Sequence, residues 1–310
     1  MTAPGRLTST PAKLTAYGIG LVLIFGAAAG AGRAIGPDQP PAPAQAHTDE
    51  HAPAAAADFP GGLQIAQDGY RLQTVTQKLS TDAEQQFAFR VLGPDGEPVT
   101  DYTENHDKDL HLIVVRRDLS GFQHLHPALA PDGTWSTPIA VDAPGQYRVL
   151  ADFQPAGTTE ALTLGVDVPA PGDYRPQPLP AAARTAEVDG YTVTLSGDLR
   201  PAAASELALS VSRNGQEVTD LEPYLGALGH LVVLREGDLA YLHVHPTADD
   251  ALAFQAEVPS PGVYRLYLDF QHGGTVRTAE FTATTTGVTQ PPPTAGTTED
   301  DHDADGHTHD

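Results

Sequence analysis

The sequence predicts an all-β protein, with two tandem immunoglobulin-like β-sandwiches after an N-terminal transmembrane helix and with a disordered linker and tail. Three observations support this prediction. One uncharged apolar run lies near the N-terminus, a pattern of turns, short strands and histidines occurs twice, and Pro-rich or acidic segments flank the two copies. Short strands separated by turn signals are typical of a sandwich, and neither copy has helical periodicity over a long window.

The N-terminal run covers residues 14–32 and contains no charged residue. At about 1.5 Å per residue, it is long enough to cross a bilayer as a helix. Because Arg6, Lys13 and the amino terminus charge the leading side, the positive-inside rule places residues 1–13 in the cytoplasm. We therefore expect a single-pass cell-membrane protein whose bulk is extracytoplasmic. The alternative is a secreted protein, cleaved near the signal-peptidase-like triplet at residues 44–46.

Three further segments have compositions that cannot form a packed core. Residues 33–60 and 169–184 are rich in Pro and Ala, and we expect them to act as a tether and a linker. Residues 287–310 form an acidic, His-rich tail that we expect to be disordered. Residues 61–168 and 185–286 remain as the first and second modules.

The two modules are copies of one repeat. Asp95-Gly96 corresponds to Asn214-Gly215, and the segment PGQYR at 144–148 corresponds to PGVYR at 261–265. Such Gly-containing dipeptides mark turns between short strands. The strands expected in the first module cover residues 70–79, 84–92, 110–116, 122–126, 134–141, 147–153 and 161–168.

Composition restricts the chemistry of the chain. Forty acidic and 17 basic side chains give a formal net charge of -23, which opposes contact with phosphate backbones, so we expect no nucleic-acid partner. There is no cysteine and the one methionine is the initiator, which excludes disulfides, thiolate metal sites and Met-rich Cu(I) sites. The 13 histidines imply that any metal site uses imidazole and carboxylate, a set that favours Cu(II), Zn(II) or Ni(II).

Each module carries the pattern His-x12-His-x-His-Pro. Strand alternation puts the last two histidines of each set on one face. In the second module, a two-residue turn at Glu236-Gly237 would place His230 opposite His243, and a register shifted by two would place it opposite His245. Either register predicts an open three-imidazole site for Cu(II) or Zn(II). The predicted ligands are His111, His124 and His126 in the first module and His230, His243 and His245 in the second.

Alternatives remain open for these residues. Asp152 and Asp269 are candidates to orient the imidazoles or complete the ligand set, but each follows an arginine by four residues, so surface ion pairs with Arg148 and Arg265 are the other interpretation. The strand that carries His230 is apolar on both faces, so the triads could instead be structural histidines bonded to loop carbonyls. His106 and His272 occur in one copy only and are interpreted as incidental.

The tail is a separate candidate for weak metal chelation. His302, His307 and His309 alternate with carboxylates there, and residues 47–51 repeat the pattern in the tether. Such tracts gather Zn, Cu or Ni loosely. The alternative is a solvated acidic tail with no ligand.

Residues 225–234 (LGALGHLVVL) and 241–246 (YLHVHP) resemble segments of exported or membrane-anchored bacterial proteins, especially actinobacterial ones described as heavy-metal-associated. In outline these are similar to the YtkA-like and CopC-like modules of copper handling. The resemblance implies extracytoplasmic metal association, in metal homeostasis or resistance, with another extracytoplasmic metal-handling protein as a partner. It implies no defined reaction.

Two functions therefore compete. The first is membrane-tethered binding of a divalent metal ion, and the second is a structural or protein-interaction module displayed at the cell surface. We expect no enzyme, because the sequence contains no G-x-S-x-G, P-loop or H-E-x-x-H pattern.

Overall fold

The structure is a computed structural model that describes residues 59–248, 250–288 and 290. The predicted cytoplasmic segment, the membrane span at 14–32 and the tail histidines lie outside these residues. Within the part of the chain that is described, no helix is long and apolar enough to cross a membrane. Both modules belong to one compact unit, Asp58–Asp310.

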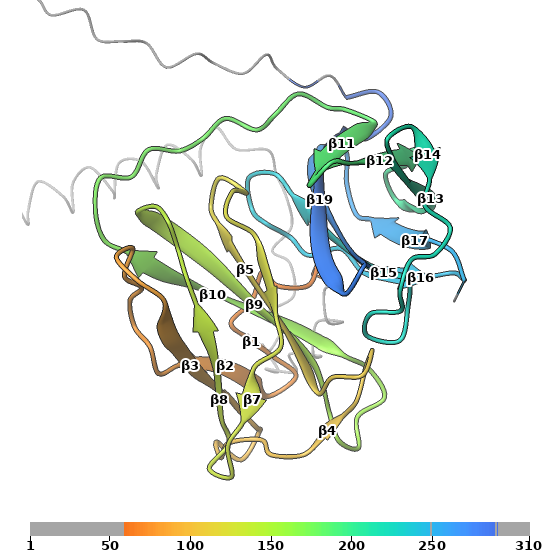
Figure 1. Ribbon diagram of the computed structural model, residues 1–310. Helices are drawn as coiled ribbons and strands as arrows, with labels where there is room; N and C mark the ends of the chain where they lie inside the picture. Colours follow the sequence, from red (N-terminus) through yellow and green to blue (C-terminus); the bar gives the residue numbers. More distant parts are fainter. Residues whose placement is uncertain (1–58, 249, 289, 291–310) are drawn as a thin grey trace, which may run out of the picture. The chain divides into compact units, whose positions relative to one another are not determined.

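The prediction of two all-β sandwiches in tandem is confirmed, since each module contains two sheets and every ladder between strands is antiparallel (Figure 1). In the first module one sheet has the order β1-β2-β3-β8-β7 and the other β10-β9-β5-β6, with β4 paired to β9. The strands are β1 (Ala66–Gln67), β2 (Tyr70–Thr74), β3 (Gln85–Leu92), β4 (Tyr102–Thr103), β5 (Leu110–Arg116), β6 (Gln123–Leu125), β7 (Ala128–Leu129), β8 (Thr134–Ile139), β9 (Gly145–Pro155) and β10 (Leu162–Ala170).

The second module also has two sheets, but its sheet with β15 lacks a counterpart of β6. One sheet has the order β11-β12-β13-β17-β16, with β14 paired to β13, and the other has the order β15-β18-β19. The strands are β11 (Thr185–Val188), β12 (Tyr191–Ser196), β13 (Ala203–Arg213), β14 (Gln216–Glu217), β15 (Gly229–Arg235), β16 (Val244–Pro246), β17 (Ala253–Val258), β18 (Val263–His272) and β19 (Thr275–Thr284).

Each sandwich closes over its own apolar core because its strands alternate between inward apolar and outward polar residues. In β3, for example, Phe87, Phe89 and Val91 are fully buried while the intervening residues are partly exposed. This alternation is what a strand with one solvated face requires.

Strands β5 and β15 depart from this alternation because both of their faces are buried. Leu112 and Val114 of β5 face the core of the first module, whereas Ile113 and Val115 belong to a third apolar cluster. This inter-module cluster joins residues of both modules, and Leu179 of the linker packs against it. Its buried members are Ile113, Val115, Leu119, Leu150, Val232, Leu234, Leu239 and Tyr267. One sheet of each module therefore packs its outer face against the other module.

An aromatic pair anchors the inter-module cluster. The rings of Phe122 and Tyr267 stack with centroids 3.9 Å apart, and the Tyr267 hydroxyl donates a 2.6 Å hydrogen bond to the Leu119 carbonyl. Because Tyr267 belongs to β18 and both partners belong to the first module, this contact holds the two sheets together.

We expect Tyr267→Ala to lower the free energy of unfolding by about 3–5 kcal/mol, because it removes a buried ring from the contact between the modules. Tyr267→Phe should cost about 1 kcal/mol, for the lost hydrogen bond alone. The matched control is Val276→Ala at a side chain that is 39% exposed, which should change stability by less than about 0.5 kcal/mol. Urea denaturation measures all three, and a Tyr267→Ala variant as stable as the control would contradict the packing described.

Candidate functional site

The first predicted histidine triad assembles at the hairpin of β5 and β6. The ladder pairs Leu112 with Leu125 and Ile113 with His124, so His124 lies on the same outward face as Ile113. His111 and His126 lie next to it, and one nitrogen of each of the three rings lies within 4.8 Å of the others. The structure thus brings together all three residues of this set, on the face that the second module covers.

The nitrogens of the triad converge at short distances. Nδ1 of His111 lies 3.0 Å from Nε2 of His124 and 3.2 Å from Nε2 of His126. The opposite nitrogens have their own partners. His111 Nε2 lies 3.0 Å from the Asn105 carbonyl, and His124 Nδ1 lies 2.8 Å from Oδ2 of Asp269 in the second module.

These outer partners determine where the protons of the two rings lie. A carbonyl oxygen and a carboxylate oxygen only accept, so Nε2 of His111 and Nδ1 of His124 are the donors. In neutral rings the lone pairs then lie on His111 Nδ1 and His124 Nε2, the two atoms that face each other at 3.0 Å. Two acceptors at this distance repel unless a cation or a proton lies between them.

Burial makes a proton on two of these rings costly. It lowers the pKa of His111 to about 3, assisted by the neighbouring His124 and His230 and opposed by the Asn105 hydrogen bond. Burial likewise lowers the pKa of His126 to about 3, assisted by the neighbouring His124 and His111. His111 and His126 are therefore neutral imidazoles at neutral pH, in the form that binds a metal ion.

Asp269 binds an imidazole, and that imidazole belongs to the first module. It is 3% exposed, it lies opposite His230 in the ladder of β15 and β18, and it accepts hydrogen bonds from His124 and from the Thr278 hydroxyl. The alternative ion pair with Arg265 does not form, because that guanidinium binds Glu280.

Asp152 is the counterpart of Asp269 and lies opposite His111 in the ladder of β5 and β9. Its carboxylate accepts hydrogen bonds from the Thr163 hydroxyl at 3.0 Å and the Tyr241 hydroxyl at 3.4 Å, and burial raises its pKa. Here too the alternative ion pair with an arginine is wrong, because Arg148 binds Asp167 instead. Asp152 therefore faces the second module without holding an imidazole.

The second predicted triad does not assemble as expected. Among the described residues, the set of His230, His243 and His245 does not meet the close spacing of the first triad. His230 lies instead beside the first triad, with its ring centre 6.3 Å from that of His111 and 6.2 Å from that of His124. Its Nε2 donates to the Tyr224 carbonyl at 2.9 Å, as His111 does to the equivalent Asn105.

The reason lies in the path of the chain after β15. Leu234 bridges to Tyr241 and the Leu242 amide donates to Val233, so the hairpin has the shifted register rather than the one set by a two-residue turn at Glu236-Gly237. The chain then leaves this sheet, and β16 pairs with β17 of the other sheet. His245 consequently lies opposite Gln255 and never comes opposite His230.

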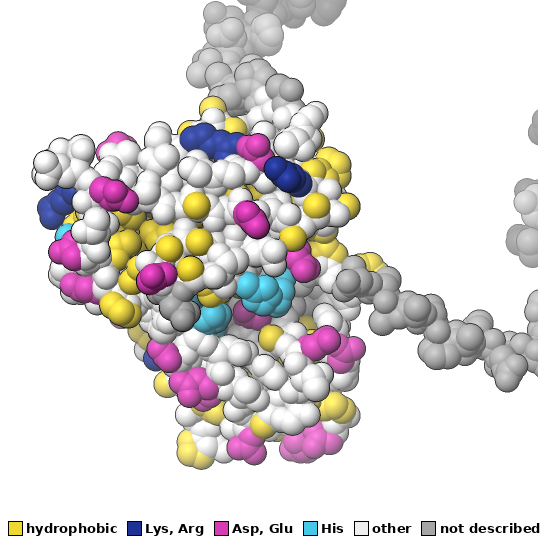
Figure 2. Space-filling view, turned by 90° about the vertical axis from the view of Figure 1, so that its right-hand side faces the viewer, with side chains coloured by type: hydrophobic (Ala, Val, Ile, Leu, Met, Phe, Trp, Pro, Cys, Tyr) yellow, Lys and Arg dark blue, Asp and Glu magenta, His cyan; other side chains and the backbone are white. Residues whose placement is uncertain are grey.

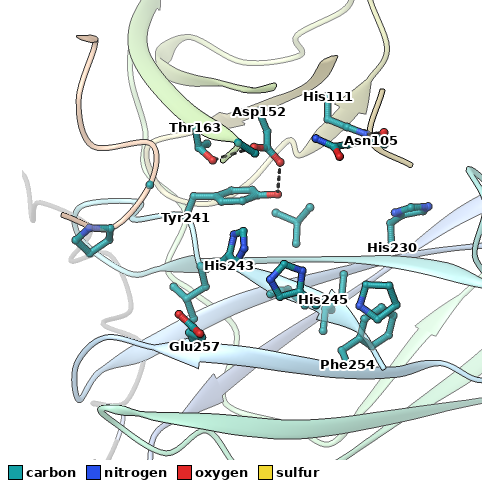
Figure 3. Close-up of a pocket in the computed structure, with 18 of the residues that line it drawn as sticks. Asn105, His111, Asp152, Thr163, His230, Tyr241, His243, His245, Phe254 and Glu257 are labelled. Atoms are coloured by element: carbon teal, nitrogen blue, oxygen red, sulfur yellow. Dashed lines mark hydrogen bonds between the residues drawn. The ribbon is translucent and has the colours of Figure 1, made fainter. Parts of the chain in front are cut away.

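A cavity of about 1000 Å³ connects these groups. Figure 3 shows His243 and His245 across the cavity from Asp152, with His230 to one side, and Figure 2 shows histidines gathered at the surface in the middle of one face. The histidines that line it are His106, His111, His124, His230, His243 and His245.

His106 is the site residue that the sequence did not reveal. Its ring centre lies 5.2 Å from that of His230 and 6.1 Å from that of His111, so it is part of the cluster and not incidental. A comparison of the two copies passes over it because the second module has Leu225 at the equivalent position. By contrast, His272 is bonded to Tyr191 and Asp220 and does not line the cavity.

Residues 65–175 and 186–287 each match one family model, described as a domain of unknown function (DUF8832). No curated protein matches the sequence.

Matches among solved structures have low similarity. The Escherichia coli adhesin FdeC is 14% identical, with 72% of this chain and 65% of that chain covered and a TM-score of 0.23. Invasin, a bacterial integrin-binding protein, is 14% identical over 72% of this chain and 41% of its own, with a TM-score of 0.22. The D0-D1 domain of intimin is 12% identical over 69% and 97%, with a TM-score of 0.19. This chain spans less than two thirds of the FdeC chain, and likenesses of this size carry no argument about function.

The lowered pKa values predict an acid-sensitive fold when the protein is held in a chelator. Below about pH 6.5 the unfolded chain protonates its histidines while His111 and His126 in the folded chain stay neutral down to about pH 3. The unfolded state then binds more protons, so the free energy of unfolding should fall as pH is lowered through this window. Urea denaturation from pH 7 to 4 tests this. A His126→Gln variant should lose less stability over the same range, and equal pH slopes for the two proteins would contradict the assignment.

Proposed function

We propose that this protein binds a divalent metal ion, Cu(II) or Zn(II), at the histidine cluster between its two modules. The chain belongs to the family DUF8832, a domain of unknown function, which both modules match. The protein would bind the ion outside the cytoplasm, tethered to the cell membrane by residues 14–32. Its role would be binding in metal homeostasis or resistance, with no catalytic step.

The observation that supports this proposal is that two imidazole nitrogens of the first triad direct their lone pairs toward each other. Nδ1 of His111 and Nε2 of His124 both lack a proton if their rings are neutral, because their other nitrogens donate to Asn105 and Asp269. A metal ion bound by both nitrogens removes the repulsion. Nε2 of His126 supplies a third imidazole at the same point.

The donor set suits these two metals. Three neutral imidazoles with a remaining open position are typical of zinc sites and of Cu(II) sites with nitrogen ligands. A carboxylate that accepts the outer N–H of a ligating histidine fixes its tautomer and strengthens it as a ligand, which is the relation of Asp269 to His124. His230, with its Nε2 donating to Tyr224, has its Nδ1 free to serve as a further ligand.

The extracytoplasmic location rests on the sequence. The uncharged run at 14–32 with its basic leading side and the resemblance to copper-handling modules both support it. The histidines of the tail, His302, His307 and His309, would act as a weak collector of metal ions, and another extracytoplasmic metal-handling protein is the partner we propose.

A structural role is the second candidate, and one observation favours it. If His124 carried a proton on both nitrogens, it would donate to Asp269 and to His111 together. The same geometry would then be a hydrogen-bonded network that joins two surface-displayed modules. A measurement of metal binding distinguishes the metal-binding function from the structural one.

We expect titration calorimetry with Cu(II) or Zn(II) to detect one tight site in a variant in which the five histidines of the tether and the tail are replaced by asparagine. These are His47, His51, His302, His307 and His309. In this background His124→Ala should abolish tight binding, because it removes a central ligand. Asp269→Asn keeps the ligands but should weaken affinity by about 10–100-fold.

The matched control is His272→Ala, which changes a histidine of the second module outside the cavity and should leave affinity unchanged. Lack of micromolar binding by the parent chain, or equal affinities of the parent and His124→Ala, would reject the metal site in favour of the structural role.

A further inference from the structure

We propose that His243, His245 and Glu257 form a second, solvent-exposed metal site at the opening of the inter-module cavity, and that this capture site loads the buried triad. The inference rests on the proposed function and adds the route by which the ion arrives. The sequence pattern instead groups His243 and His245 with His230, a set that the structure does not bring together.

The capture site is a product of the strand switch at β16. Because His245 is paired with Gln255, the neighbouring His243 lies opposite Glu257, and the Glu257 amide donates a 3.1 Å hydrogen bond to the His243 carbonyl. Side chains directly opposite or two residues apart on paired strands share one face. The two imidazoles and the carboxylate therefore project from the same patch of this sheet, as Figure 3 shows.

These three side chains are exposed, whereas in the triad His111 is buried and His124 and His126 are partly buried. The ring centres of His243 and His245 are 4.1 Å apart. Among the described residues these two rings and Glu257 do not have the close spacing of the triad, so all three side chains must change rotamer to bind one ion, which exposed side chains do on the ps–ns timescale. Two imidazoles and one carboxylate form a ligand set for Zn(II) or Cu(II). Because the set must close around the ion, it should bind more weakly and exchange faster than the preorganised triad.

The second line of support is that the three residues of the capture site line the same cavity as His111 and His124 of the triad. His111 is only 7% exposed, so an ion needs a route to it. His106 and His230 supply that route, because the ring centre of His106 lies 5.2 Å from that of His230 and 6.1 Å from that of His111. Asp152 adds a carboxylate to the cavity wall. An ion can pass between neighbouring imidazoles by exchange of one ligand at a time.

The test measures both the rate at which Zn(II) binds and the affinity of the tight site, in the full chain with asparagine at the five histidine positions of the tether and tail. Zn(II) is added from a weak chelator in a stopped-flow instrument, and the bound metal is counted at equilibrium. The variant His243→Ala/His245→Ala should slow loading of the tight site by about tenfold or more, because the local concentration of the ion at the opening falls. The affinity of the tight site should stay unchanged, and the weaker second equivalent of metal should disappear.

Two further variants make the result decisive. Glu257→Gln replaces an exposed carboxylate with an amide and should lower the affinity for the second, weakly bound metal ion. Circular dichroism verifies that this variant keeps the fold. His272→Ala should change neither rate nor stoichiometry.

Each outcome addresses a separate claim. A double variant with the loading rate and stoichiometry of the parent chain would overturn the capture site and leave the buried site standing. A parent chain that binds no metal would overturn both. Loss of tight binding in the double variant would show that His243 and His245 belong to the main ligand set, which also overturns a separate capture site.

Discussion

The apolar packing of one sheet of each module against the other is the interaction on which the candidate site depends. Ile113 and Val115 of β5 and Val232 and Leu234 of β15 bury the outer faces of their sheets against the neighbouring module. At about 25 cal/mol per Å² of apolar surface, such a contact is a substantial part of the stability of a small domain. The same packing shields the polar side chains at the ends of these two faces from solvent and places side chains of both modules next to one another.

This packing explains why the site uses residues from both modules. Without the second module, His111, His124 and His126 would lie on the open face of a hairpin. Asp269 of β18 accepts a hydrogen bond from His124 and so fixes its tautomer. Asp269 is itself buried, so this part of the cluster is shielded from water. The first module therefore supplies the three imidazoles of the triad, and the second module supplies the carboxylate that binds one of them.

The two copies have different roles because their chains diverge at one point. In the first module β6 stays on β5 through Leu125, which keeps His124 with His111. In the second module the chain crosses to the other sheet after Leu242, which carries His243 and His245 to the exposed face. A duplicated sequence pattern has thus produced one buried cluster and one exposed pair.

Much of this follows from the sequence, and the exceptions have physical causes. Strand alternation and the repeat predict the sandwiches and the shared face of His124 and His126. Of the two registers that the sequence left open for the second hairpin, the structure has the shifted one, because Asp238 binds Arg235 and the Ala240 amide and so stabilises a longer loop than the Glu236-Gly237 turn. The pairing of Asp269 with a histidine of the other module depends on tertiary packing, which no local pattern encodes.

The most direct test of the account is anomalous X-ray diffraction at the zinc absorption edge, on crystals of the full chain grown with equimolar Zn(II). The account predicts an anomalous peak about 2.0–2.1 Å from Nδ1 of His111, Nε2 of His124 and Nε2 of His126. Absence of a peak at these atoms, with His111 Nδ1 still at hydrogen-bond distance from His124 Nε2 and His126 Nε2, would contradict it.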